Sequence, residues 1–255
     1  MRSLLDLYRN GNGMETYVWE QLMAKGELQE GTAEWSEAHT VAVETMGRVR
    51  QNVSMIVEHL AGQKYIFGMD LENGNNPAQV WVAPEPNTSE MLRRLTQLVG
   101  PIPMSLRTWW EVVGSVSLQG TFSDLADEGL PMSDPLMVPP LSQVLAEAED
   151  PVDEDVVSAL DLAPDIYHKA DVSGGLPYQI EVPNSRADGA LRNVRIFLPC
   201  PPGSKLDYKE LETNESFIEY LRRSFMWAGF PGLAFVDNEP MVEHLRPIFA
   251  RMLPL

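Results

Sequence analysis

An apolar stripe over residues 32–60 constrains the fold more than any other feature of the chain. Its members recur at spacings of three or four residues, which is the period of one face of an α-helix. The eight members are Trp35, Ala38, Ala42, Met46, Val49, Val53, Ile56 and Leu60. Because Thr32 is a suitable N-cap and Ala61-Gly62 a suitable end, the pattern predicts a helix of about 44 Å. The stripe must then pack on the rest of the same chain or against a second copy.

Shorter helices and strands follow one another irregularly along the rest of the chain. Helices are expected at residues 14–25, 88–99, 105–112, 141–149, 214–227 and 239–253, the last of which contains Pro247. Strands are expected at residues 64–67, 79–82, 114–120, 178–182 and 194–198, and a loop at 131–140. No regular crossover helix separates the strands, so we predict an α+β fold rather than a doubly wound parallel sheet.

The chain is acidic, and the excess charge is concentrated in one stretch. It has 37 acidic and 19 basic residues among 255, which gives a net charge of −18 at pH 7. Between Thr108 and His168 there are 13 acidic residues and no lysine or arginine. This balance argues against nucleic acid or an anionic membrane as the main partner, since both require basic residues. An acidic surface suits a basic protein partner, although a charge run is also typical of a merely solvated surface.

We predict that part of this stretch forms a face that steers a basic partner. The residues assigned to the face are Asp124, Asp127, Glu128, Glu147, Glu149, Asp150, Asp153, Glu154 and Asp155. Trp109 and Trp110 precede all nine residues in the sequence and are a possible aromatic anchor for the partner. Neighbours on a helix point about 100° apart, so we expect one of the two indoles to be partly exposed. Burial of the aromatic residues in the core is the alternative.

Residue patterns that would carry catalysis or bind a metal are missing from the sequence. The motifs GxxxxGK[ST], GxGxxG, HExxH and GxSxG do not occur. Cys200, the only cysteine, lies in a proline-rich run with no nearby histidine that would activate it. Residues 153–155 lack the ligand spacing of a Ca²⁺ loop, and Ser173-Gly174-Gly175 precedes an expected strand instead of a helix. We therefore expect that the protein is not an enzyme and that it binds neither a cofactor nor a metal ion.

The sequence also bears on the compartment of the protein. It contains no apolar run long enough to span a membrane and does not begin like a signal peptide. A single cysteine forbids an internal disulfide. We therefore expect a cytoplasmic location.

Three short segments share a pattern with a known superfamily. Residues 100–116, GPIPMSLRTWWEVVGSV, are similar to the pattern GxLPxxLxxFYxxVGGV, with Ser115 where a second glycine is common. Residues 134–138, DPLMV, resemble a following DPLxV segment, and residues 227–232, WAGFPG, resemble the ending WGGFPG, with Ala228 in place of a glycine. Together, over roughly residues 62–233, the chain resembles the SUKH superfamily. That superfamily includes the Smi/Knr-type cell-wall regulators of yeast and many bacterial proteins.

The resemblance implies an α+β domain at residues 62–255, with a central, mostly antiparallel sheet and flanking helices, after a helical N-terminal extension at residues 1–61. It also implies a protein-binding module and not a catalyst. Many bacterial members are thought to be immunity proteins that block secreted toxins, often nucleases. Resemblance and charge together predict an immunity-type protein that neutralises a basic toxin. The alternative is an intracellular regulator or scaffold of the Smi/Knr type with no toxin partner, either a monomer or a homodimer through the helix at residues 32–60.

Overall fold

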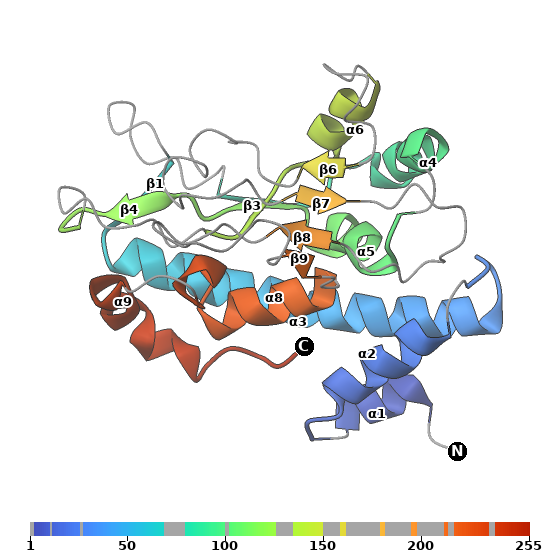
Figure 1. Cartoon of the computed structure of the whole chain (residues 1–255), viewed down its shortest axis with the longest axis horizontal. Coiled ribbons are helices and arrows are strands. Elements are labelled where there is room, and N and C mark those ends of the chain that lie inside the picture. Colours follow the sequence, from blue (N-terminus) through green and yellow to red (C-terminus); the bar gives the residue numbers. More distant parts are fainter. Residues whose placement is uncertain are drawn as a thin grey trace.

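The long helix predicted from the apolar stripe is present as α3 (Ala33–Gly62), which extends across most of the molecule in Figure 1. The Thr32 hydroxyl accepts a hydrogen bond from the backbone N–H of Trp35, as expected of an N-cap. Trp35 is half-buried, and the other seven members of the stripe are fully buried. The same chain covers the stripe, so the stripe offers no apolar seam to a second copy.

The computed structural model describes the N-terminal half of the chain more completely than the C-terminal half. The described residues are 3–10, 12–25, 28–68, 80–99, 102–125, 135–149, 159–161, 179–181, 195–197, 212–213, 217–234 and 238–255. The first three residues of the helix predicted at 214–227 lie outside them. No helix among the described residues is long and apolar enough to cross a membrane.

Helices from both ends of the chain pack around α3. At the N-terminal end, α1 (Leu4–Asn10) packs against α3 and against α2 (Glu15–Ala24), and Figure 1 shows both below α3. On another side, α5 (Met104–Val112) packs against α3 and against α8 (Phe217–Met226). The last helix, α9 (Glu239–Phe249), also contacts α3. The 30-residue helix α3 therefore contacts helices from the N-terminal, middle and C-terminal parts of the chain.

Two of the predicted helices have the expected bounds, namely α4 (Thr88–Val99) and α6 (Leu141–Glu149), which pack against each other. In α4, Leu92 and Leu95 are buried, whereas Leu98 is 48% exposed. The apolar face of α4 therefore ends about one turn before the helix does.

The C-terminal helix is shorter than expected. α9 contains Pro247 without breaking there and ends at Phe249 rather than at residue 253. The Asn238 side chain caps its start by accepting from the N–H of Met241. A short 3-10 helix, η3 (Pro231–Ala234), precedes it.

The described strands form three separate sheets, and every pairing is antiparallel. The two-stranded sheet pairs β1 (Tyr65–Phe67) with β4 (Gly120–Phe122). The three-stranded sheet has the order β2 (Trp81–Val82), β3 (Ser115–Ser117) and β5 (Met137–Val138). The four-stranded sheet has the order β6 (Ala159–Asp161), β7 (Gln179–Glu181), β8 (Arg195–Phe197) and β9 (Glu212–Thr213). The α+β class with antiparallel strands is confirmed.

Two strand predictions need correction. Residues 114–120, predicted as one strand, contribute to two sheets, because β3 ends at Ser117 and Gly120 begins β4 beside β1. The chain changes sheets at Leu118, whose side chain is fully buried and whose N–H donates to the carbonyl of Leu136. The expected loop at residues 131–140 contains β5, which pairs with β3. Both differences arise because strands pair with partners that are distant in the sequence.

One hydrophobic core includes residues from both sides of position 61. Trp19 and Val53 belong to it from the N-terminal side, and Trp109, Phe217 and Leu245 from the C-terminal side. The division into an extension at residues 1–61 and a domain at 62–255 stays a prediction.

Candidate functional site

The three segments that carry the family resemblance meet where β3, β5 and the end of α8 come together. β3 pairs with β5, and just after β3 the N–H of Leu118 donates to the carbonyl of Leu136 at 3.0 Å. The N–H of Leu136 in turn donates to the carbonyl of Gly229 at 2.7 Å. Main-chain hydrogen bonds therefore connect parts of the chain that are far apart in the sequence.

Three glycine positions of the family pattern have a backbone geometry that favours glycine. Gly114 has a φ of +97° and Gly229 a φ of +91°. Ala228, which stands where the pattern has glycine, has a φ of +51°. At Gly114 an added Cβ would also overlap the carbonyl oxygen of Val82. Backbone conformation and close packing therefore explain why glycine suits these positions in this chain.

The expectation that Trp109 or Trp110 is partly exposed is wrong, because their exposed fractions are 0% and 1%. α5 packs against α3, α4 and α8, so helix faces that point in different directions are all covered. Trp109 meets Phe217 edge to face at 5.7 Å between ring centres, and Trp110 donates its Nε1–H to the carbonyl of Pro139 at 3.1 Å. Both indoles belong to the core and offer no anchor to a partner.

Of the nine acidic residues predicted to steer a partner, the structure describes the side chains of Asp124 and Glu149. Asp124 follows β4 and lies 3.2 Å from Nε2 of His244, with its side chain 64% exposed. Glu149 ends α6 and forms an ion pair with Arg94 of α4. β4 and α6 lie well apart in Figure 1, so the structure does not bring these two acids together. Glu147 lies on α6, and Asp127, Glu128, Asp150, Asp153, Glu154 and Asp155 lie outside the described residues.

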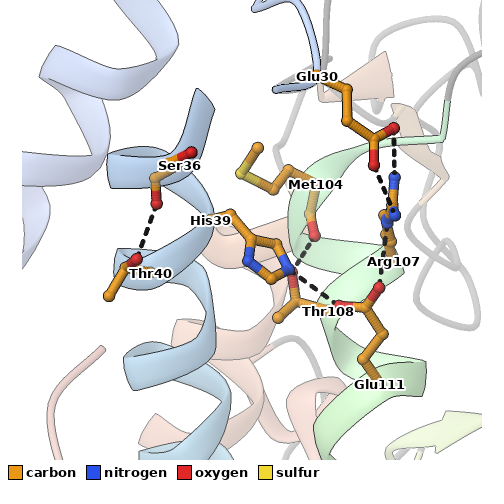
Figure 2. A network of polar contacts seen from close by, with 8 residues as sticks. All are labelled: Glu30, Ser36, His39, Thr40, Met104, Arg107, Thr108 and Glu111. Atoms are coloured by element: carbon orange, nitrogen blue, oxygen red, sulfur yellow. Dashed lines mark hydrogen bonds and ion pairs between the residues drawn. The ribbon is translucent and has the colours of Figure 1, made fainter. Parts of the chain in front are cut away.

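Figure 2 shows a network of ion pairs that joins the segment before α3, α3 itself and α5. Arg107 donates to both carboxylate oxygens of Glu30 at 3.2 and 3.3 Å, and to Glu111 at 3.1 Å. Nε2 of His39 lies 3.0 Å from the other oxygen of Glu111. Trp35 stacks on His39 at 4.8 Å, and the Arg107 guanidinium lies 5.6 Å from the Trp35 ring. The cluster holds two carboxylates, a guanidinium and an imidazole against one indole.

The charges in this network stabilise one another. Burial of Glu111 raises its pKa, but hydrogen bonds from His39 and Arg107 outweigh burial, so the pKa lies below the ordinary value of 4.5. Burial lowers the pKa of Arg107, but its hydrogen bonds to Glu30 and Glu111 outweigh burial and raise it. Glu111 and Arg107 are therefore both charged near neutral pH.

An imidazole beside a carboxylate is the arrangement of a general base, but the hydroxyls drawn in Figure 2 are engaged elsewhere. Ser36 donates to the carbonyl of Thr32 at 2.9 Å, and Thr40 donates to the carbonyl of Ser36 at 2.7 Å. Thr108 donates to the carbonyl of Met104. Within the described ranges, no group of three or more His, Cys, Asp or Glu residues is placed to hold a metal ion. We assign the network the role of fixing α5 against α3.

Sequence reasoning did not predict this network, although one of its ion pairs has a recognisable spacing in the sequence. Arg107 and Glu111 stand four residues apart on one helix, which is the spacing of an ion pair. The partners Glu30 and His39 come from other elements, and only the packing of α3 on α5 brings them together.

A second polar cluster, the backbone clamp, consists of Arg48 and Asn52 on α3 and Arg222 on α8. These three side chains bind the main chain of residues 253–255, which follow α9. The contacts are Asn52 Nδ2 to the Leu253 carbonyl at 3.0 Å, the Leu253 N–H to Asn52 Oδ1 at 2.7 Å, Arg48 to the Pro254 carbonyl at 3.0 Å, and Arg222 Nε to the backbone oxygen of Leu255 at 2.7 Å. Sequence reasoning could not predict this cluster, because no local pattern relates the helices to residues 253–255.

The four histidines of the chain, Cys200 and residues 173–175 lie partly within and partly outside the described ranges. His39, His59 and His244 are half-buried, and each makes a polar contact, that of His59 being with the carbonyl of His244 at 2.7 Å. His168, Cys200 and residues 173–175 lie outside the described residues.

Comparison with known proteins adds no relative to this picture. A scan against protein-family models and searches of curated proteins and of solved structures find no match to this chain. The resemblance therefore rests on the sequence pattern of the segments that carry it.

Proposed function

We propose that the chain is a non-catalytic protein-binding module of the immunity type, which binds and neutralises a basic toxin. The observation that carries this proposal is the meeting of the three family-like segments through the hydrogen bonds of Leu118, Leu136 and Gly229. The positive φ of Ala228 supports it further, since the family pattern has glycine where this backbone geometry occurs. The function itself follows from the resemblance and from the charge of the chain.

The charge of the chain supports a basic partner. Acidic residues exceed basic ones by 18, and several surface arginines are already engaged by acids of the same chain. Arg93 pairs with Glu90, and Arg246 pairs with both Glu239 and Glu243. The remaining negative field would attract a basic protein and speed its encounter with the chain.

The proposal is tested with the protein encoded beside the gene for this chain in its native genome. Expressed alone in bacteria, that neighbour should arrest growth, and co-expression with this chain should restore it. The purified pair should form a complex whose association rate falls roughly tenfold between about 50 and 500 mM salt. A neighbour that neither arrests growth nor binds the chain contradicts the immunity assignment. An association rate that ignores salt contradicts only the electrostatic part.

Two charge variants separate the acidic stretch from the overall charge. Replacing the three acids at residues 153–155 by their amides removes charge from the predicted face. Replacing Glu20, Glu34 and Glu58 by glutamine removes the same charge from exposed positions of α2 and α3. Only the first variant should slow association. Equal slowing by both variants would mean that net charge acts without a particular face.

The alternative function, a regulator of the Smi/Knr type that dimerises through the helix at residues 32–60, gains no support from α3. The stripe that would form the seam is buried within the chain. Light scattering on the purified protein tests this directly, and a dimer that dissociates when exposed residues of α3 are changed would revive the alternative.

A further inference from the structure

The guanidinium of Arg48 contacts two parts of the chain that lie far apart in the sequence. On one side, Nη1 donates to the Glu15 carboxylate at 3.0 Å, Nη2 donates to the Tyr8 carbonyl at 3.2 Å, and the Tyr8 ring lies 4.4 Å away. On the other side, Nη1 donates to the carbonyl of Pro254 at 3.0 Å. A guanidinium is planar, and its donors point in fixed directions. Because one nitrogen serves both Glu15 and Pro254, a rotation that breaks one of these bonds also disturbs the other.

The ion pair between Arg48 and Glu15 is largely withdrawn from solvent. The exposed fractions of the two side chains are 17% and 10%. Removing one partner of such a pair leaves the other charge without compensation in a poorly solvated place, which costs much more than the loss of an exposed pair. The pair of Arg9 and Glu44, which joins α1 to α3, provides the comparison, since its side chains are 50% and 31% exposed.

Glu15 also interacts electrostatically with the second arginine of the backbone clamp. Burial lowers the pKa of Arg222, and the negative charges of Glu219 and Glu15 oppose part of that change. Arg222 in turn donates through Nε to the backbone oxygen of Leu255 at 2.7 Å. One carboxylate at the start of α2 therefore supports both arginines of the clamp.

Asn52, the third member of the clamp, lies one turn along α3 from Arg48. Its side chain is fully buried, and both its donor and its acceptor pair with the main chain of Leu253 at 3.0 and 2.7 Å. A buried amide keeps this geometry because either group costs free energy when it is left unpaired. The N–H of Leu253 therefore reports whether residues 253–255 keep their place against α3.

We propose that Arg48 is a relay, which couples the position of α2 against α3 to the placement of residues 253–255. A shift of α2 that takes Glu15 away from Arg48 loosens the contacts to residues 253–255. Loss of those contacts loosens the start of α2 in return, since a coupling free energy acts equally in both directions. This inference goes beyond the proposed function and holds or fails whether or not the chain binds a toxin. It also means that α1 and α2 cannot be removed without an effect on residues 253–255.

Hydrogen exchange of the Leu253 amide in the full chain tests the first direction. The variant Glu15→Gln keeps the size of the side chain and removes the charge that orients Arg48. Exchange of the Leu253 amide should become more than about fivefold faster, although Leu253 is bonded to Asn52 and not to Glu15. The matched control Glu44→Gln removes the exposed ion pair to Arg9 and should leave the Leu253 amide unchanged.

The opposite direction is tested at the start of α2. The Val18 N–H donates to the carbonyl of Met14 at 2.9 Å and so reports on the first turn of this helix. The variant Asn52→Leu removes the pairing with Leu253, and the Val18 amide should then exchange faster than in wild type. Amides in the middle of α3 distinguish this effect from lower global stability, since they should change less than the Val18 amide.

Urea unfolding provides a measurement that does not depend on assigning single amides. In the double variant of Glu15→Gln and Asn52→Leu, the change in the unfolding equilibrium constant should differ more than about threefold from the product of the two single changes. The same two substitutions should act independently when Arg48→Met has removed the relay.

Three results would overturn the proposal. The first is a Glu15→Gln protein in which exchange of the Leu253 amide rises less than about fivefold. The second is an equal rise in the control Glu44→Gln, which would show a general loosening of the helices. The third is an Asn52→Leu protein in which the Val18 amide exchanges at the wild-type rate, or whose combination with Glu15→Gln gives the simple product of the two effects.

Discussion

Replacing Gly47 by alanine should stabilise the protein. Gly47 lies in the interior of α3, and a Cβ added there meets no heavy atom within 4 Å. Glycine in a helix interior destabilises by about 0.5–1 kcal/mol relative to alanine, because the unfolded chain gains more conformational freedom. Since the added methyl group meets no neighbouring atom, the free energy of unfolding of Gly47→Ala should rise by about 1 kcal/mol. For a chain of this length that corresponds to a rise in Tm of about 2–4 °C.

The same substitution at Gly114 is the matched control with the opposite sign. Gly114 has a φ of +97°, and a Cβ added there would overlap the carbonyl oxygen of Val82 and lie 2.7 Å from the carbonyl carbon of Ala83. A left-handed backbone costs an L residue about 1–2 kcal/mol, and the steric overlap costs about 1–3 kcal/mol more. The free energy of unfolding of Gly114→Ala should therefore fall by roughly 3 kcal/mol.

Urea unfolding followed by tryptophan fluorescence measures both effects on one scale. The slope against urea should be unchanged in Gly47→Ala, so that the shift in midpoint reports stability alone. A Gly47→Ala protein that is less stable than wild type would refute the reasoning about α3. Equal changes in the two variants would refute the assignment of different backbone environments.

Three further predictions concern the site. Ala228→Gly should raise the free energy of unfolding by about 0.5–1 kcal/mol, since relief of its φ of +51° exceeds the flexibility that glycine adds to the unfolded chain; a lower Tm would contradict this. Trp110→Phe should cost about 1–3 kcal/mol in chemical denaturation, because it leaves the buried carbonyl of Pro139 without its donor; an unchanged midpoint would show that this bond contributes nothing. The lowered pKa of Glu111 contributes stability that is present above its ordinary value of 4.5 and is lost as the pH falls through the lower folded value. Glu111→Gln should therefore destabilise at pH 7 and flatten the loss of stability in acid, and parallel pH curves for the two proteins would argue against it.

The sequence by itself determined the elements whose causes are local. The stripe and the Thr32 cap predicted α3, and the bounds of α4 and α6 followed from their own apolar spacing and flanking residues. Helix periodicity and caps depend on residues within a few positions of one another, so a single sequence contains them in full. The α+β class followed from the order of such elements.

Only the tertiary structure decided which faces are covered and which distant residues meet. Trp109 and Trp110 are both buried because three helices surround α5, a fact that no local pattern contains. His39 and Glu111 are 72 positions apart, and Asn52 and Leu253 are 201 positions apart. Such pairs form because the packing of α3 brings their elements together, and the free energy of that packing belongs to the whole core. The polar contacts that matter most here therefore became visible only in three dimensions.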